Sequence, residues 1–198
     1  TRNGIVKRTE IQNYKNLRAP GLIALNLREG DELIGVRVVR DDSRIVLSTS
    51  QGLAIHFKAG EIRPCGRQAT GVKGINLRNK DKVVSLVIAD GDQRNSLFTI
   101  SENGFGKKTS LDMYKIQARG GKGLINMRVT PKTGEVLGSM LVSDEDELIL
   151  FTSANKIIRV SVKDIRLVGR STQGVKMINL ENDQKVICFD QIIQENQI

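Results

Sequence analysis

Short apolar runs separated by polar residues make up most of the chain. Three of them, residues 43–49, 95–100 and 146–152, are rich in Val, Ile, Leu and Phe and are bounded by polar turns, as strands typically are. Each leads through a turn into a second run, such as "LAIHFK" at residues 53–58, and no convincing long helix is visible. The pattern therefore predicts β-hairpins and an all-β fold.

The same pattern returns about every fifty residues. Four segments align: "APGLIALNL", "ATGVKGINL", "GKGLINMRV" and "TQGVKMINL". We call the glycine on which each segment aligns its anchor, and the anchors are Gly21, Gly71, Gly123 and Gly174. Hairpin turn tips keep the same register, at Gly4, Gly52, Gly104 and Asn155. Gly and Asn tolerate the positive φ of a tight hairpin turn, so the tips support the alignment.

Two further features keep this register. A bulky apolar residue lies ten residues after each tip, at Tyr14, Ile62, Tyr114 and Ile165. A final apolar run closes each unit, at residues 32–39, 82–89, 135–142 and 185–192. We therefore expect four antiparallel strands per unit, in approximate blades 1–40, 41–90, 91–142 and 143–198 of one domain. Four-stranded units that bury their faces against neighbours are typical of propeller-type folds.

Known propeller repeats fit this pattern poorly. WD repeats are shorter and carry Trp, which this chain lacks, and the double glycine of kelch repeats occurs once, at Gly120 and Gly121. The first unit begins inside its hairpin, at "TRNG", without a first strand and without Met. We expect the sequence to be a piece of a longer protein.

Composition adds a polyanionic partner to this picture. The 198 residues include 31 Lys and Arg against 22 Asp and Glu, which gives a formal net charge of +9. Such an excess favours nucleic acid or an anionic membrane. The cations are spread along the chain and no apolar run is long enough for a membrane span, so we favour nucleic acid. The two cysteines, Cys65 and Cys188, are far apart, which fits a reducing cytoplasm.

Catalytic and metal-binding patterns are missing from the sequence. His56 is the single histidine, and the other repeats have Arg or Lys at the same position. This equivalence favours a polar surface site over catalysis. No HExxH, Walker A or EF-hand motif occurs. The acidic stretch 143–147 is interpreted as a solvated turn, and Tyr14 and Tyr114 share one packing position. We predict no catalytic site and no metal site.

Cations also recur at fixed positions of the repeat. Four residues after the tips lie Arg8, His56, Lys108 and Arg159, with Lys7 and Lys107 directly before two of them. Further cations lie three or four residues before the anchors or two residues after them: Arg18, Arg67, Arg119, Arg170, Lys73 and Lys176. A cation at the same place on every blade predicts a belt around the surface. A belt suits a polymer of phosphates, and the scarcity of aromatic residues favours duplex over single-stranded DNA.

One loop in this series is unusually rich in glycine. Residues 117–123 read QARGGKG, without the spacing of a Walker loop. Gly120 and Gly121 are expected to let the backbone approach a phosphate and expose N–H donors to it, with Arg119 and Lys122 supplying charge. A flexible β-turn is the alternative interpretation.

The same loop resembles the QRRGGKG box of the C-terminal domain of the DNA gyrase A subunit. Six residues match, and Ala118 replaces an arginine: Gln117, Arg119, Gly120, Gly121, Lys122 and Gly123. Segments such as "GDELIGV", "DKVVSLV" and "VGRSTQGV" extend the resemblance over essentially the whole chain. It implies a six-bladed β-pinwheel whose blades exchange strands, of which this chain resembles the last four. The family's box usually lies in the first blade, whereas here it lies in the third visible unit.

The resemblance also implies a function. The family bends duplex DNA around its basic rim and thereby supports ATP-dependent negative supercoiling by a type II topoisomerase. The cofactors ATP and Mg²⁺ and the catalytic tyrosine are expected elsewhere, in an A2B2 holoenzyme that also contains the rest of the gyrase A chain together with the gyrase B chain. The resemblance also implies that the protein lies in the bacterial cytoplasm, in association with the nucleoid.

Two alternatives stay open. One is the C-terminal domain of the topoisomerase IV A subunit, which resembles this chain but usually has a degenerate box. The other is a propeller-type scaffold that binds an acidic protein. Retention of most of the box favours gyrase over topoisomerase IV, and the repeated cations favour DNA over a protein partner.

Overall fold

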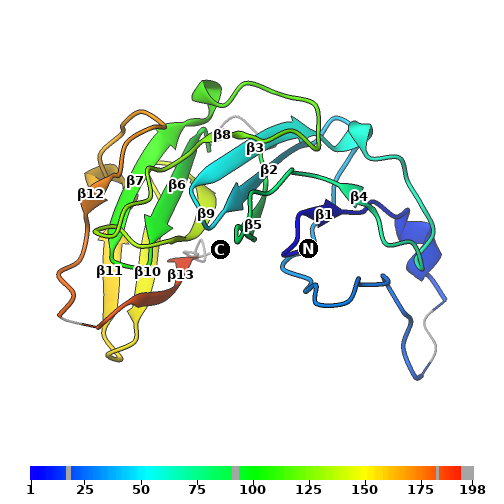
Figure 1. The fold of residues 1–198 in the computed structure, drawn as a ribbon, viewed down its shortest axis with the longest axis horizontal. Helices are drawn as coiled ribbons and strands as arrows, with labels where there is room; N and C mark the ends of the chain where they lie inside the picture. The colour runs from blue at the N-terminus through cyan, green and yellow to red at the C-terminus, as the bar shows by residue number, and fades with distance from the viewer. Residues whose placement is uncertain (17–18, 91–93, 182, 193–198) are drawn as a thin grey trace, which may run out of the picture.

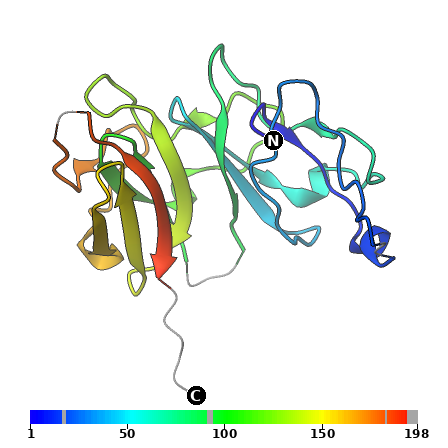
Figure 2. The ribbon, with the colours of Figure 1, turned by 90° about the horizontal axis from the view of Figure 1, so that it is seen from below.

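The repeats fold into an arch of small antiparallel sheets (Figure 1). The structure, a computed structural model, describes residues 1–16, 19–90, 94–181 and 183–192. Seen from below (Figure 2), the sheets stand side by side, with the C-terminal repeats on the left and the N-terminal repeats on the right. The all-β prediction is confirmed, since the helices of the described residues are short 3-10 turns: η1 (Ile11–Tyr14), η2 (Ala59–Glu61), η3 (Leu111–Met113) and η4 (Val162–Asp164).

Two sheets have the expected four strands. The first has the order β5-β2-β3-β8 and comprises β5 (Val83–Ile88), β2 (Arg44–Thr49), β3 (Leu53–Lys58) and β8 (Leu124–Ile125). The second has the order β9-β6-β7-β12 and comprises β9 (Val136–Val142), β6 (Ser96–Ser101), β7 (Phe105–Ser110) and β12 (Val175–Lys176). In Figure 1, β5 and β9 lie on the inside of the arch and β8 and β12 on its outer edge.

The two end sheets are smaller. A three-stranded sheet contains β13 (Val186–Ile192), β10 (Glu147–Thr152) and β11 (Ile157–Ser161), in that order. A two-stranded sheet contains β1 (Ile5–Val6) and β4 (Val72–Lys73). All pairs between these strands are antiparallel.

The second, third and fourth repeats each donate the strand after their anchor to the sheet of the preceding repeat. Strands β4, β8 and β12 follow anchor glycines and pair with β1, β3 and β7, the second hairpin strands of the repeats before them. The pairing register is the same each time, since the residue after the anchor lies opposite the second residue after the tip. The alignment of the last three anchors is therefore confirmed, and a complete sheet draws on two repeats. This is the strand exchange that the resemblance implied.

The turn tips support this exchange. The predicted positive φ is present at all four, with values of 78° at Gly4, 80° at Gly52, 77° at Gly104 and 56° at Asn155. The carbonyl of Gly52 accepts N–H groups of the incoming anchor segment, from Asn126 at 2.8 Å and Met127 at 3.1 Å. A Cβ atom at Gly52 would lie 2.1 Å from the carbonyl oxygen of Met127, so the donated strand leaves no room for a side chain.

The bulky position ten residues after each tip belongs to the core, as predicted. Ile62, Tyr114 and Ile165 are 4%, 2% and 4% exposed, whereas Tyr14 in the first repeat is only half-buried. Tyr114 packs in a cluster with residues of the preceding sheet, including Val46. These residues therefore fill the space between neighbouring sheets, which no single repeat could close.

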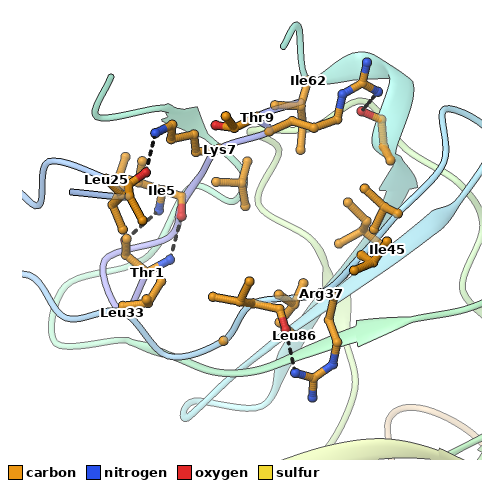
Figure 3. A pocket seen from close by; sticks show the side chains of 18 of the residues that line it. Thr1, Ile5, Lys7, Thr9, Leu25, Leu33, Arg37, Ile45, Ile62 and Leu86 are labelled. Atoms are coloured by element: carbon orange, nitrogen blue, oxygen red, sulfur yellow. Dashed lines mark hydrogen bonds between the residues drawn. The ribbon is translucent and has the colours of Figure 1, made fainter. Parts of the chain in front are cut away.

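The fourth strand of the first repeat is not formed, which corrects the prediction for residues 32–39. Its counterparts β5, β9 and β13 each pair with the first strand of their own hairpin, and the described residues contain no such strand before β1. Val36 and Val38 are accordingly 70% and 84% exposed. Beside this segment lies an apolar cavity of about 570 Å³ (Figure 3), with Leu33 among its lining residues.

Candidate nucleic-acid interface

The loops between the 3-10 turns and the donated strands run along the outer edge of the arch, which we call the rim (Figure 1). They comprise residues 63–71, 115–123 and 166–174. Each loop follows a buried residue of the inter-sheet core and ends at an anchor glycine, so both of its ends are fixed.

The cations four residues after the tips form contacts between repeats. Lys108 is 5% exposed, and its Nζ lies 2.5 Å from a carboxylate oxygen of Asp144 and 3.0 Å from the carbonyl of Val162. Arg8 makes the corresponding ion pair with Asp41, at 2.9 Å. Both acids lie eleven residues before the tip of the following repeat. In these two repeats, the position therefore joins the hairpin to residues that flank the following hairpin.

His56 occupies the same position and is also buried, at 4% exposed. Its Nδ1–H donates to the carbonyl of Tyr114 in the next repeat, at 2.7 Å. Burial lowers the pKa of His56, so the ring is neutral at pH 7. Arg159 alone is exposed at this position, where it pairs with Glu147. The prediction of a surface belt is wrong for His56 and Lys108, because the side chains here face the neighbouring sheet.

Lys7 and Lys107, three residues after their tips, also point inward. Lys107 is fully buried, and its Nζ donates to the carbonyls of Gly169 at 2.9 Å and Arg170 at 2.8 Å. Lys7 is half-buried and donates to the carbonyl of Arg67. Burial, with a smaller effect of Arg170, lowers the pKa of Lys107 to about 7; burial also lowers the pKa of Lys7. The surface position predicted for Lys107 is therefore wrong.

The arginines four residues before the anchors form a regular series along the rim. Each donates an Nη1–H to the carbonyl two residues after the preceding anchor: Arg67 to Ile23 at 3.2 Å, Arg119 to Lys73 at 3.1 Å and Arg170 to Ile125 at 3.0 Å. All three are half-buried, so part of each side chain faces solvent. Arg18, three residues before the first anchor, lies outside the described residues.

Lys73 and Lys176 are exposed on the donated strands β4 and β12, at the outer edge of their sheets. The Nζ of Lys73 donates to the side chain of Asn76 at 3.3 Å. These two lysines thus lie on the same edge as the arginine series.

The glycine-rich loop, residues 117–123, is tied to the repeat before it. The N–H of Gln117 donates to the carbonyl of His56 at 2.8 Å, and the N–H of Gly120 donates to the carbonyl of Gly74 at 2.6 Å. The expected free donor at Gly120 is therefore wrong, since that N–H already has a backbone partner.

The remaining residues of this loop divide into anchored and open ones. Arg119 donates its backbone N–H to the carboxylate of Glu61 at 2.9 Å and its Nε–H to the carbonyl of Glu61 at 3.0 Å. Gly123 has a φ of 75°, and a Cβ there would lie 2.6 Å from a backbone oxygen. Lys122, by contrast, is exposed and has no hydrogen bond or ion pair to the rest of the described chain. A Cβ at Gly121 would meet only ordinary contacts.

A second series of repeated cations was missed in the sequence, and three of its four members begin the rim loops. It lies eleven residues after each tip, directly after the bulky core position: Lys15, Arg63, Lys115 and Arg166. All four are exposed, and none forms a side-chain ion pair within the described residues. The signal was present, because each cation directly follows the bulky apolar position of its repeat. Recognising the series required knowing that the bulky residue before each cation points toward the core while the cation itself faces solvent.

The described residues contain no group of three or more His, Cys, Asp and Glu side chains that could hold a metal ion. Within the same residues, no helix has the length and apolar character needed to cross a bilayer.

The fold and rim together define a propeller-type repeat domain whose sheets exchange strands and whose outer edge is basic. The model of the family described as "DNA gyrase C-terminal domain, beta-propeller" matches residues 1–40, 43–90, 95–143 and 146–187. The DNA gyrase A subunit of Lawsonia intracellularis (strain PHE/MN1-00) is 47% identical over 193 residues, which cover 97% of this chain. The chain belongs to the DNA gyrase C-terminal domain family. It spans 24% of the length of that relative.

Two solved structures share the fold. The C-terminal domain of DNA topoisomerase IV has a TM-score of 0.90 and 28% identity, over 96% of this chain and 59% of that one. The DNA gyrase A C-terminal domain has a TM-score of 0.85 and 24% identity, over 97% of this chain and 64% of that one. The second likeness, at this identity, concerns the fold alone.

Proposed function

We propose that this chain is a DNA-binding and DNA-wrapping domain of a DNA gyrase A subunit. It bends duplex DNA around its rim and so supports ATP-dependent negative supercoiling by the whole enzyme. The observation that carries this proposal is that exposed cations eleven residues after the tips and half-buried arginines four residues before the anchors lie in the same three loops. These loops, residues 63–71, 115–123 and 166–174, follow the outer edge of the arch (Figure 1).

Repetition along an arc suits bent DNA. Each cation that neutralises a phosphate releases counterions and adds affinity without reading sequence. Bending a site of 20–30 base pairs by 40–90° costs about 1–6 kcal/mol on elastic estimates. Contacts that accumulate from one repeat to the next can offset this cost, whereas a single basic patch cannot.

The proposed contacts differ in kind. We assign direct phosphate contacts to the exposed and half-exposed cations Lys15, Arg63, Arg67, Lys73, Lys115, Arg119, Lys122, Arg166, Arg170 and Lys176. Arg18, which lies outside the described residues, is proposed as a further contact from its place in the repeat alone. The buried cations His56, Lys107 and Lys108 and the half-buried Lys7 and Arg8 act indirectly, by holding repeats and loops in place. Gln117, Gly120, Gly121 and Gly123 shape the loop that presents Lys122, and Arg159 is a peripheral contact.

The rest of the enzyme supplies the chemistry. We infer partners in the remainder of the gyrase A chain and in the gyrase B chain, in an A2B2 assembly. ATP, Mg²⁺ and the catalytic tyrosine are assigned to those parts, and the site of action is the nucleoid in the bacterial cytoplasm. The repeats 1–40, 41–90, 91–142 and 143–198 then act as one wrapping domain.

The test is a topology measurement on nicked circular DNA, which is religated in the presence of the full-length protein before its linking number is measured. The wild type is expected to shift the linking number, and the variant Arg63→Gln/Lys115→Gln to lose most of the shift. The matched control is Lys82→Gln/Lys185→Gln, which removes two exposed or half-exposed charges next to the inner strands β5 and β13. The absence of any shift with saturating wild-type protein would contradict wrapping.

A second candidate is the corresponding domain of topoisomerase IV, favoured by the TM-score of 0.90 to that structure. The two differ in what the whole enzyme does. ATP-dependent introduction of negative supercoils identifies gyrase, whereas relaxation and decatenation without supercoiling identifies topoisomerase IV.

A further inference from the structure

Lys107 is a buried cation without an acidic partner. Its side chain is 0% exposed, and its Nζ lies 3.0 Å from Oγ1 of Thr109, 2.9 Å from the carbonyl of Gly169 and 2.8 Å from that of Arg170. No carboxylate pairs with it in the part of the chain that the structure describes. Buried lysines are ordinarily paired with acids, because removing an ammonium from water is costly. A buried lysine without a carboxylate partner therefore needs an explanation.

The group that Lys107 holds is a rim loop. Both carbonyls belong to the loop from which Arg170 projects, and its guanidinium also donates to the carbonyl of Ile125 at 3.0 Å. The same guanidinium lies 5.9 Å from the ring centroid of Tyr114. Lys107 thus fixes the backbone and Tyr114 the side chain of one proposed phosphate contact.

Among the described residues, Arg170 is the charge that acts on Lys107. Thr99, its partner across β6, is neutral, and Tyr114 stays protonated because burial raises the pKa of its hydroxyl. Lys108, next on β7, has its own carboxylate partner in the following repeat. Arg170 remains, and its repulsion adds to burial in lowering the pKa of Lys107 to about 7.

We propose that Lys107 is a positioning residue for the rim, and that its protonation is coupled to the binding of a DNA phosphate at Arg170. The proposal rests on the DNA-binding function proposed above. A phosphate beside Arg170 offsets the repulsion between the two cations, so Lys107 takes up a proton from solvent when DNA binds. The ammonium donates to all three acceptors. A neutral amine can still donate to the two loop carbonyls, but these hydrogen bonds are weaker without the charge. Protonation therefore strengthens the hold of Lys107 on the loop while DNA is bound.

The repeat supplies a second instance and a control. Lys7 occupies the same position in the first repeat and donates to the carbonyl of Arg67, the rim arginine of the following repeat. The equivalent residues of the second and fourth repeats are Ile55 and Ile158. Isoleucine is therefore compatible with this place in the fold. Lys107→Ile removes the titrating group and its hydrogen bonds to the rim loop, and it leaves a side chain that two other repeats accept at this position.

The direction of the pH effect follows from linkage. Binding raises the pKa of Lys107 above its value in free protein, so affinity is greatest below the free value and is lost as pH rises through the bound value. A rise of one unit corresponds to about a tenfold loss of affinity over this range. Near the midpoint it corresponds to uptake of about half a proton per domain.

The experiment measures the affinity of the full-length protein for a linear DNA duplex from about pH 6 to 9 at constant salt. The wild type is expected to lose affinity as pH rises, and Lys107→Ile to have a weaker and flatter profile. Equal slopes in the two proteins would overturn the proposal. If Lys107 had a structural role alone, its replacement would lower the affinity by the same factor at every pH. A wild type that fails to bind DNA at any pH would instead contradict the DNA-binding function itself.

Calorimetry gives a readout that does not depend on folding of the lysine variant. Binding heats in two buffers of different ionisation enthalpy yield the number of protons taken up. The wild type is expected to take up protons near neutral pH, and Arg170→Gln, which removes the coupled charge, to take up fewer. Equal proton uptake in wild type and Arg170→Gln would overturn the coupling.

Discussion

At the scale of single residues, the turn tips show how one backbone requirement is met in two ways. Gly52 and Asn155 both have positive φ values, of 80° and 56°. Gly52 must in addition leave room for the strand donated by the next repeat, whereas the described chain contains no strand that crosses the tip at Asn155. Asn is the residue that most often replaces Gly in this conformation, and here nothing in the described chain prevents its side chain.

Gly52→Ala is expected to destabilise the fold by more than about 2 kcal/mol, the sum of a left-handed backbone and a clash with the donated strand. Gly21→Ala is the control, because Gly21 has a φ of 82° but no atom within 4 Å of the added Cβ. That variant is expected to cost only about 1–2 kcal/mol. Urea unfolding of both proteins measures the difference, and equal losses would contradict the steric account.

At the scale of elements, the unit of folding is a hairpin that accepts a strand from the next repeat. The buried polar contacts follow the same logic. Lys108 reaches from β7 to the acid and the carbonyl of the following sheet, and His56 reaches from β3 to the backbone of Tyr114. Side chains for which the sequence predicted a surface belt therefore form hydrogen bonds and ion pairs between neighbouring repeats.

Lys108→Met is expected to lower the free energy of unfolding by about 1–3 kcal/mol, since a buried carbonyl loses its hydrogen bond and Asp144 loses its ion pair. Arg159→Met changes the equivalent position of the last repeat, where the side chain is exposed, and is expected to leave stability nearly unchanged. Thermal or urea unfolding of the two variants provides the comparison. A larger loss in Arg159→Met would contradict the assignment of this position to inter-repeat contacts.

At the scale of the whole molecule, the arched arrangement of the repeats places equivalent cations in a curved row. The sheets stand along an arch with the donated strands β8 and β12 and the loops before the anchors at its outer edge (Figure 1), so cations at equivalent positions of these loops follow one another on the rim. A scaffold for an acidic protein would need only a local patch. The arrangement therefore favours a long polyanion.

Binding to duplex DNA is expected to weaken steeply with salt, with a log–log slope near −0.9 per phosphate neutralised. Arg63→Gln is expected to reduce the magnitude of that slope by about one contact. His56→Gln, at a buried position, is expected to leave the slope unchanged even if it alters affinity. A shallow slope in the wild type would instead favour an acidic protein partner.

The sequence alone determined the period, the strands of the complete repeats, the glycine tips and the core position of residues such as Tyr114. These follow from local backbone chemistry and from alternation of apolar residues, which act over a few residues. The tertiary structure decided which cations face solvent. One side of the second hairpin strand packs against the following repeat, and the sequence does not say which side that is. Lys107 and Lys115 look equally charged in the chain, yet the first is buried against a loop and the second is exposed on the rim. The same reason explains why residues 32–39 have a strand's sequence without a strand's structure: a strand needs a partner, and only the assembled sheet provides one.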